Sequence, residues 1–449
     1  MSFIPTGYSV QEELHKSRSR TVYRALRADD SQTVILKVPT SEQPLPGELA
    51  GLRQEFDITR RLDLSGVVQA FTLEENNGSL AIVLEDFNGR SLRDALGAKR
   101  TKVRAFLRIA IRLTEILGFI HRENIIHKDI KPDNIIINTQ TGEVKITDFG
   151  IASQLSRENQ SSIHPERMEG TLAYMSPEQT GRMNRALDYR SDFYSLGCVF
   201  YEMLTGLMAF RSKDPLELVH AHIARMPEEP HPHFADVPPM ISKIVMKLLS
   251  KTVEDRYQSA YGLRMDLIRC LSDLKEHSQI QDFPPGQKDL SDRLQIPQKL
   301  YGRDGETEQI LAAFERVAAG GAELMLVAGY SGIGKSALVH EIHKPITAHR
   351  GHFLSGKFDQ FKRNVPYSAV IQAFQQIVRE ILRESQKKID QWREELSQAL
   401  GANAQLIIDV IPELELVIGK QPPVPELSGS EAQNRFNDIF QKFIKVFAT

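Results

Sequence analysis

The sequence predicts an α+β chain in which a strand-rich segment is followed by a helical segment, a linker and a second, α/β module. Three observations support this prediction. Apolar runs at 33–38 and 80–85 have the length and the Val, Ile and Leu content of strands. From residue 91 onward, apolar residues recur at helical spacing. After a polar stretch, a continuous apolar run at 323–329 ends in glycine, which is typical of a buried parallel strand.

The composition is that of an ordinary globular protein. The 449 residues are 41% hydrophobic and 25% charged, and at about 150 residues per domain the length predicts two or three domains. The chain has 56 Lys and Arg residues against 58 Asp and Glu residues, a net charge of −2. This balance lacks the basic excess of a protein that binds nucleic acid or an anionic membrane.

Cysteine usage and the N-terminus indicate a reducing cytoplasm. The two cysteines, Cys198 and Cys270, are too few for a disulfide framework or a cysteine-rich zinc site. The first residues lack the basic flank and apolar run of a secretory signal. No apolar run reaches the roughly 20 residues that a membrane helix needs.

The first module is expected to span residues 1–275. Between its two predicted strands, the mixed charged and apolar positions of 47–62 predict a helix. Residues 101–123 carry apolar side chains on one helical face, which predicts a helix packed against a core. These side chains are Val103, Phe106, Leu107, Ala110, Leu113, Leu117 and Ile120.

Residues 276–298 are polar, contain three prolines and show little periodicity, so we interpret them as a linker. In the second module, 299–449, the predicted strand at 323–329 is followed by helical patterns at 335–348 and 368–399. The last residues form an amphipathic helical pattern without a stop signal, which predicts that the module continues beyond Thr449.

The sharpest chemical signal is HKDIKPDNIIIN at 127–138, followed by KITDFG at 145–150. Phosphoryl transfer needs a group to accept the hydroxyl proton, ligands for Mg²⁺ and cations on the phosphates. Asp129 suits the first task, and Lys131 can stabilise the transferring phosphoryl group. Asn134 and Asp148 offer the hard oxygens that Mg²⁺ prefers.

These residues resemble the catalytic loop and the D-F-G segment of the protein-kinase fold, and the resemblance extends over about residues 8–274. It implies a bilobal fold with ATP between the lobes. Lys37 in VILK would hold the α- and β-phosphates, and Glu55 would pair with it. In IVLEDF, Leu84 resembles the gatekeeper, and Glu85 to Phe87 would offer backbone groups to adenine. Val22 would close the loop over the nucleotide.

The resemblance also covers the segments that dock substrate and hold the lobe together. GTLAYMSPEQ at 170–179 resembles the docking loop and the A-P-E segment, with Ser176 in place of alanine. It implies that Glu178 pairs with Arg256 and that Asp192 holds the backbone of the catalytic loop. Lys131 with Thr171 resembles the serine/threonine-specific branch. The serines between Gly150 and Gly170 are Ser153, Ser156, Ser161 and Ser162, and they leave both autophosphorylation and an ordinary polar loop open.

Two departures from the family pattern keep a pseudokinase open as an alternative. Aligned on Val22, the glycine-rich loop has His15, Ser17 and Arg20 in place of its three glycines, although glycines there let backbone amides approach the phosphates. Lys128 replaces the usual arginine beside Asp129. The complete set of catalytic residues favours an active enzyme.

A second nucleotide motif, GYSGIGKS, lies at 329–336 between the predicted strand and a helix. Gly329 opens the motif. The amides of Gly332, Gly334 and Lys335 would wrap phosphates, the Lys335 ammonium would reach the β- and γ-phosphates, and Ser336 would hold Mg²⁺. With LYGRDGETEQILAAFERV at 300–317, it resembles the front of a STAND- or AAA-type ATPase, with Tyr301 to Arg303 on the adenine side.

An acidic residue at the end of a neighbouring strand would complete this ATPase site. Asp409 in QLIIDVIPEL is one candidate, but the same run can be drawn as a helix, and the acidic strand is then expected beyond Thr449. Histidines at His220, His222, His231 and His233 allow a metal site by type alone. No carboxylate or cysteine completes an obvious set, so a polar surface is the favoured interpretation.

Together these signals predict a cytoplasmic serine/threonine protein kinase in a signalling chain. We expect ATP at two sites, Mg²⁺, a protein substrate, no nucleic acid and no membrane segment in this chain. The resemblance is to large multi-domain bacterial signalling kinases, including hybrid sensor kinases of two-component systems, and it implies further signalling domains after residue 449. The alternative is a nucleotide-binding scaffold that switches a downstream module.

Overall fold

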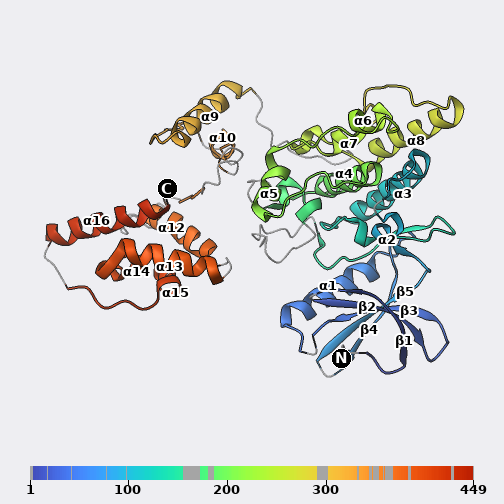
Figure 1. Ribbon diagram of the computed structural model, residues 1–449, viewed down its shortest axis with the longest axis horizontal. Helices are drawn as coiled ribbons and strands as arrows, with labels where there is room; N and C mark the ends of the chain where they lie inside the picture. Colours follow the sequence, from blue (N-terminus) through green and yellow to red (C-terminus); the bar gives the residue numbers. More distant parts are fainter. Residues whose placement is uncertain are drawn as a thin grey trace. The chain divides into compact units, whose positions relative to one another are not determined.

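The computed structural model of the chain describes residues 4–17, 19–41, 43–76, 78–97, 99–154, 172–180, 187–290, 302–330, 333–342, 346, 353–356, 358, 368–382, 386–425 and 429–447. The chain divides into two compact units (Figure 1). The first unit comprises residues 1–306 and 327–340, and the second comprises residues 307–326 and 341–449.

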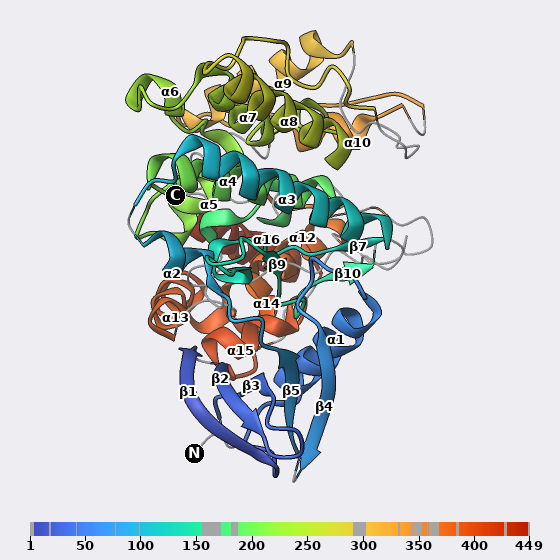
Figure 2. The same cartoon turned by 90° about the vertical axis from the view of Figure 1, so that its right-hand side faces the viewer.

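A five-stranded antiparallel sheet forms the N-terminal lobe of the first unit. The strands are β1 (Tyr8–Lys16), β2 (Arg20–Arg27), β3 (Thr33–Pro39), β4 (Ala70–Asn76) and β5 (Ser79–Glu85). They lie in the order β1-β2-β3-β5-β4, which Figure 2 shows from one edge to the other. Both predicted strands, at 33–38 and 80–85, are confirmed as β3 and β5 in the middle of this sheet.

One helix, α1 (Pro46–Arg61), packs against the sheet, as the pattern of 47–62 predicts. Pro46 opens the helix, where its missing N–H costs no hydrogen bond. Glu48 accepts a hydrogen bond from the Leu45 N–H at 2.9 Å, which caps the first turn. Leu52 and Phe56 of α1 are buried against β5 residues such as Leu80 and Ile82. This packing fixes the helix face that carries Glu55.

The C-terminal lobe is helical and holds most of the core. Its helices are α2 (Leu92–Leu96), α3 (Val103–Arg122), α4 (Arg190–Thr205), α5 (Pro215–Ala224), α6 (Pro230–His233), α7 (Pro239–Leu248) and α8 (Ala260–Glu276). Helix α4 contacts α3 and α7, and α8 contacts the same two helices. Phe106 and Phe200 meet edge to face across α3 and α4. Cys198 and Cys270 are both free and buried in this core.

Short strands flank the loops that contain the predicted catalytic residues. β6 (Arg90–Ser91), β8 (Ile135–Ile137) and β9 (Val144–Ile146) form one small sheet, and β7 (Ile125–Ile126) pairs with β10 (Ser153–Gln154). The 3-10 turn η1 (Pro132–Asn134) precedes β8. The Ile146 N–H donates to the Gly66 carbonyl at 2.9 Å, which ties β9 to the N-terminal lobe.

The predicted linker at 276–298 is described as far as Leu290, and that part is packed on the helical lobe. Phe283 is buried against the lobe, with the Arg269 guanidinium of α8 4.1 Å from its ring centre. The Asp289 carboxylate accepts the backbone N–H of Gln258 at 2.6 Å and that of Ser259 at 2.8 Å, just before α8 begins. One aromatic side chain and one capping carboxylate therefore hold a segment that has no periodic pattern.

Helices make up most of the regular structure in the described part of the second unit. It contains α12 (Ser368–Ile381), α13 (Gln386–Leu400), α14 (Gln405–Ile408), α15 (Glu415–Ile418) and α16 (Gly429–Phe447). Helix α9 (Asp304–Ala318) precedes the second nucleotide motif, and α10 (Lys335–His340), in the first unit, begins within it. The helical prediction for 368–399 is confirmed in two pieces, whereas α10 is shorter than the predicted 335–348.

The predicted strand at 323–329 is wrong for this structure. Residues 321–330 are assigned to neither strand nor helix, and the Leu324 and Leu326 side chains are almost fully exposed. A central parallel strand is stable only between neighbours that satisfy its backbone and cover both faces. The residues that the structure describes provide no such neighbouring strand for this run.

Candidate functional site

Four charged side chains meet where the sheet, α1 and the segment after β9 come together. The Lys37 ammonium of β3 lies 2.6 Å from Glu55 Oε1 of α1 and 2.8 Å from Asp148 Oδ1. Arg20, the first residue of β2, places Nη1 2.6 Å from Glu55 Oε2 and 3.1 Å from the same Asp148 oxygen. The sequence predicts the Lys37–Glu55 pair. It does not predict that Arg20 joins it.

The electrostatics of this cluster set the charge states of its acids. Burial raises the pKa of the Asp148 carboxyl, but the charges of Lys37 and Arg20 outweigh it and hold the pKa below its usual range. Burial raises the pKa of Glu55, with the Asp148 charge acting in the same direction and Lys37 opposing it. Asp148 thus stays ionised near neutral pH, which is the state that could ligate Mg²⁺.

The catalytic-loop candidates form a second cluster between β7 and β8. Asp129 Oδ2 accepts hydrogen bonds from the Lys131 ammonium at 2.7 Å and from Asn134 Nδ2 at 2.8 Å. The same Asn134 amide also donates to the Asp129 carbonyl. The other oxygen, Asp129 Oδ1, is buried and has no hydrogen-bond partner among the described residues. A carboxylate oxygen without a partner can accept a hydrogen bond from a substrate hydroxyl.

Asn134 and Asp148 fit a magnesium ion by the chemistry of their donors. Asn134 uses its amide N–H₂ group on Asp129, so its side-chain carbonyl oxygen is the atom that can ligate a metal. Together with the ionised Asp148 carboxylate, it offers two hard oxygen ligands.

Asp192 of α4 fixes the backbone of the catalytic loop. Its carboxylate accepts the N–H groups of His127 at 2.9 Å and Lys128 at 2.8 Å, and it contacts His121 Nε2 at 2.8 Å. Lys128 has a φ of 68°, a left-handed conformation that is unfavourable for a residue with a side chain. The two backbone hydrogen bonds to Asp192 hold this conformation. The sequence singles out Asp192 but not His121, which is the second-to-last residue of α3.

Glu178 and Arg256 form the buried ion pair that the sequence predicts. The Arg256 guanidinium donates to both carboxylate oxygens of Glu178, at 2.7 and 2.9 Å. Next to this pair, Gln179 Nε2 donates to the Lys128 carbonyl at 2.7 Å and so connects the 3-10 turn η4 (Pro177–Thr180) to the catalytic loop. Thr171, Ser156, Ser161 and Ser162 lie outside the described residues, and Ser153 lies in β10.

The adenine-side candidates line the join between the sheet and the helical lobe. Val22 is half-buried on β2, and Leu84 is buried on β5. The Glu85 Oε1 atom accepts hydrogen bonds from the Lys145 ammonium at 2.6 Å and from the Gln69 N–H at 2.7 Å, and the Glu85 N–H donates to the Gln69 carbonyl at 2.9 Å. The Phe87 carbonyl accepts a hydrogen bond from Asn138 Nδ2 at 2.9 Å.

The second nucleotide motif is described only in part, because Ser331 and Gly332 lie outside the described residues, as does the adenine-side candidate Tyr301. The Lys335 ammonium donates to the carbonyls of Gly329 and Tyr330, each at 2.8 Å. Gly334 has a φ of 93°, a conformation that favours glycine, and Ser336 is exposed in α10. Lys335 thus lies over its own loop, where a phosphate would replace the two carbonyls.

Asp409 is not at the end of a strand. It follows α14 with helical backbone angles, and its carboxylate accepts a hydrogen bond from Gln405 Nε2 at 2.8 Å, one helical turn earlier. The helical alternative for this run is therefore correct. The four histidines also have separate environments. His222 is buried beside the Tyr194 hydroxyl at 3.0 Å, and His231 Nδ1 lies 2.7 Å from the Val237 carbonyl. Within the described ranges, no three His, Cys, Asp or Glu side chains are grouped to hold a metal.

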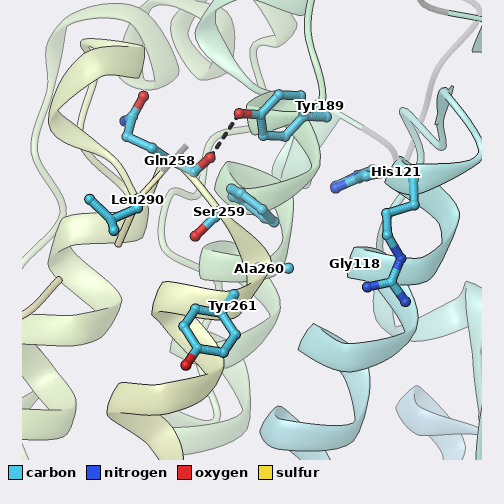
Figure 3. Close-up of a pocket in the computed structure, with 10 residues that line it drawn as sticks. Gly118, His121, Tyr189, Gln258, Ser259, Ala260, Tyr261 and Leu290 are labelled. Atoms are coloured by element: carbon cyan, nitrogen blue, oxygen red, sulfur yellow. Dashed lines mark hydrogen bonds between the residues drawn. The ribbon is translucent and has the colours of Figure 1, made fainter. Parts of the chain in front are cut away.

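A separate cavity of about 230 Å³ lies between α3 and the start of α8 (Figure 3). Gly118 and His121 line it from α3, and Ser259 and Tyr261 line it from the other side. The Tyr189 hydroxyl donates to the Gln258 carbonyl at 2.7 Å across its rim. None of the phosphoryl-transfer candidates lines this cavity, so we do not assign the nucleotide to it.

Comparison with known proteins matches the two parts of the chain to two families. The protein kinase domain model matches residues 8–268, and the AAA ATPase domain model matches residues 299–449. Hybrid signal transduction histidine kinase G of Dictyostelium discoideum is 34% identical over 435 residues, which cover 77% of this chain and 12% of that protein.

Two further relatives cover less of this chain. Serine/threonine-protein kinase PknB of Mycolicibacterium smegmatis is 34% identical over 268 residues, 59% of this chain and 41% of that protein. Histidine protein kinase 1 of Candida albicans is 25% identical over 344 residues, 69% of this chain and 14% of that protein. This chain thus spans less than half the length of each relative. No described helix is long and apolar enough to cross a membrane.

Proposed function

Because the chain belongs to the protein kinase family, we propose that residues 1–275 transfer the γ-phosphate of Mg²⁺–ATP to serine or threonine hydroxyls of a protein substrate. The observation that carries this proposal is the state of Asp129. One carboxylate oxygen is held by Lys131 and Asn134, and the other is buried with no partner among the described residues. A side chain held in this way can accept a hydroxyl proton.

Each charged group has one task in the transfer. The substrate hydroxyl oxygen attacks the γ-phosphorus, the bond to the β–γ bridging oxygen breaks, and ADP leaves with that electron pair. The hydroxyl proton passes to Asp129 Oδ1, while Lys131 stabilises the negative charge on the transferring group. Lys37, oriented by Glu55, holds the α- and β-phosphates. A magnesium ion bound by Asn134 and Asp148 would neutralise the phosphate oxygens.

Residues 299–449 are proposed to bind a second ATP at Gly329, Gly332, Gly334, Lys335 and Ser336 and to regulate the kinase. Residues 276–298 join the two domains. Support comes from the match to an AAA ATPase domain and from the position of Lys335 over the motif. Two relatives are named as histidine kinases, one of them as hybrid and signal-transducing. We therefore propose a cytoplasmic role in a two-component signalling chain, with signalling domains after residue 449.

The test is radiolabelled phosphate transfer to a general serine/threonine substrate, with the whole chain compared with Asp129→Asn. The substitution keeps the size of the side chain and removes the base, so transfer should fall by about 10²-fold or more. Asp236→Asn, an exposed change in the same lobe, serves as the matched control. Equal transfer by wild type and Asp129→Asn would refute the assignment of Asp129.

A nucleotide-binding scaffold without transfer is the second candidate. The short turn between β1 and β2, which lacks glycine, favours it, because this turn replaces the usual phosphate loop. ATP binding by wild type with no transfer above the Asp129→Asn level would select the scaffold.

A further inference from the structure

We propose that Arg20 binds the phosphates of the nucleotide in the kinase site and replaces the backbone donors of a glycine-rich loop. The inference rests on the proposed kinase function for its ligand, Mg²⁺–ATP. Arg20 lies at the position of the third glycine in the family pattern. Its guanidinium contacts Asp148, which is proposed to bind the metal, and Glu55, which orients the phosphate-binding Lys37.

Two backbone amides of the turn between β1 and β2 are committed to closing that turn. β1 runs to Lys16, which pairs with Thr21, so only residues 17–19 connect the two strands. The Ser17 N–H donates to the Arg20 carbonyl at 2.8 Å, and the Arg20 N–H donates to Ser17 Oγ at 3.1 Å. Amides committed to closing a turn cannot at the same time wrap a phosphate. Side-chain donors can take the place of these two amides.

The Arg20 guanidinium has donors to spare. Both of its contacts, to Glu55 and to Asp148, use Nη1. Nε and Nη2 make no hydrogen bond with the described residues, and the side chain is 21% exposed. Since a guanidinium presents several N–H groups in a planar fork that matches phosphate oxygens, the remaining donors suit a nucleotide phosphate.

Two glycines leave room for this side chain. A Cβ at Gly150, directly after Asp148 and Phe149, would lie 2.8 Å from Arg20 Nη2, and a Cβ at Gly51 of α1 would lie 3.3 Å from the same atom. The guanidinium thus sits in a space bounded by α1 and the D-F-G segment. A larger residue at Gly150 would push it away from Asp148.

The charge balance gives the physical reason for a second cation. Without Arg20, one lysine faces the two carboxylates of Glu55 and Asp148, and this excess of negative charge opposes an anionic nucleotide. With Arg20 the cluster is neutral. A nucleotide phosphate can then replace Asp148 as a hydrogen-bond partner of Arg20, while Arg20 Nη1 keeps its hydrogen bond to Glu55.

The experiment measures nucleotide affinity by calorimetry in the whole chain, with Lys335→Ala in every protein so that the second nucleotide motif does not contribute. Arg20→Gln and Arg20→Lys are compared with the protein that keeps Arg20. Arg27→Gln is the matched control, because it removes an arginine charge from the exposed end of the same strand. The ligands are Mg²⁺–ATP and adenosine, which lacks phosphates.

Arg20→Gln should weaken Mg²⁺–ATP about ten- to a hundredfold, the usual value of a hydrogen bond to a charged group, with adenosine affinity unchanged. Arg20→Lys should recover part of the loss, and Arg27→Gln should resemble wild type. In transfer assays the KM for ATP should rise more than kcat falls. Unchanged ATP affinity in Arg20→Gln would overturn the inference. Tighter ATP binding by Arg20→Gln would also overturn it, because it would mean that the Arg20 side chain obstructs the nucleotide site. Because these measurements are of binding, failure of wild type to transfer phosphate would refute the kinase activity alone.

Discussion

Arg256 and Glu178 form a two-pronged ion pair with both side chains buried, between the start of α8 and the 3-10 turn η4. Burial raises the pKa of Glu178, but the Arg256 charge outweighs it and lowers the pKa to about 2. A carboxyl whose pKa is lower in the folded state contributes stability above its unfolded pKa.

Arg256→Met should destabilise the kinase domain by about 3–5 kcal/mol, because Glu178 stays buried without a partner. The thermal midpoint followed by circular dichroism should fall by roughly 10 °C. Arg53→Met, which removes an exposed pair with Glu75, should cost under about 1 kcal/mol. If the two variants lose similar amounts of stability, the buried Arg256–Glu178 pair contributes no more to stability than an exposed pair.

The same pair predicts loss of stability in acid. The Glu178 pKa is about 2 in the fold and 4.5 in its ordinary state, so its contribution is complete above about pH 5 and is lost as the pH falls from 4.5 towards 2. A depression of this size corresponds to about 3 kcal/mol. Urea titrations at several pH values should show this fall in wild type. A Glu178→Gln, Arg256→Met double variant should show less of it, and an equal acid loss in both would contradict the assignment to Glu178.

Lys37→Met should reduce phosphate transfer by roughly 10²-fold or more, since a preorganised cation is removed from the phosphates. The fold should persist, because methionine can occupy the buried path of the lysine stem. Lys243→Met, an exposed lysine change, is the control. If Lys37→Met keeps full activity, the neighbouring Arg20 carries the phosphate-binding role alone.

Asp192→Asn should lower kcat about ten- to a hundredfold with little change in the KM for ATP. The amide keeps only one oxygen, so it cannot accept from the N–H groups of both His127 and Lys128 as the carboxylate does. Steady-state kinetics beside Asp236→Asn measure the effect. An unchanged kcat would mean that the catalytic loop holds the Lys128 conformation without Asp192.

The second nucleotide motif should bind one ATP analogue when the kinase site is disabled by Lys37→Met. Adding Lys335→Ala should remove that binding, because the phosphates lose their close cation, whereas adding Lys442→Ala on α16 should not. Calorimetry on the whole chain, with the fold checked by circular dichroism, measures both. If the Lys37→Met protein binds no ATP analogue, the second nucleotide motif does not bind nucleotide in this chain. We expect little hydrolysis, since Asp409 is helical and cannot serve as the strand-end acid.

Sequence reasoning succeeds here where a family pattern fixes both partners of a contact. Lys37 with Glu55, and Glu178 with Arg256, are matched to motifs far apart in the chain, and the structure brings each pair together. The strands β3 and β5 are equally predictable, because their apolar runs lie in the centre of a sheet.

The failures have physical reasons. The run 323–329 has the composition of a buried strand, but composition does not provide neighbours, and in this structure it is exposed. The contacts of Arg20 depend on a long side chain that reaches from β2 to α1 and to Asp148, which residue spacing does not encode. The segment around Asp409 is too short for strand and helix periods to be told apart.

The docking of Phe283 and Asp289 on α8 decides where the kinase domain can be cut. A fragment that ends at residue 275, the boundary predicted from the sequence, lacks Phe283 and Asp289. The surface beside Arg269 that Phe283 covers is then exposed, and the amides of Gln258 and Ser259 lose their hydrogen-bond acceptor. Uncovered apolar surface of this kind promotes aggregation during expression. A fragment that continues through Leu290 keeps Phe283 and Asp289 in place over this surface. It is therefore the better choice for crystallisation or for screening of inhibitors.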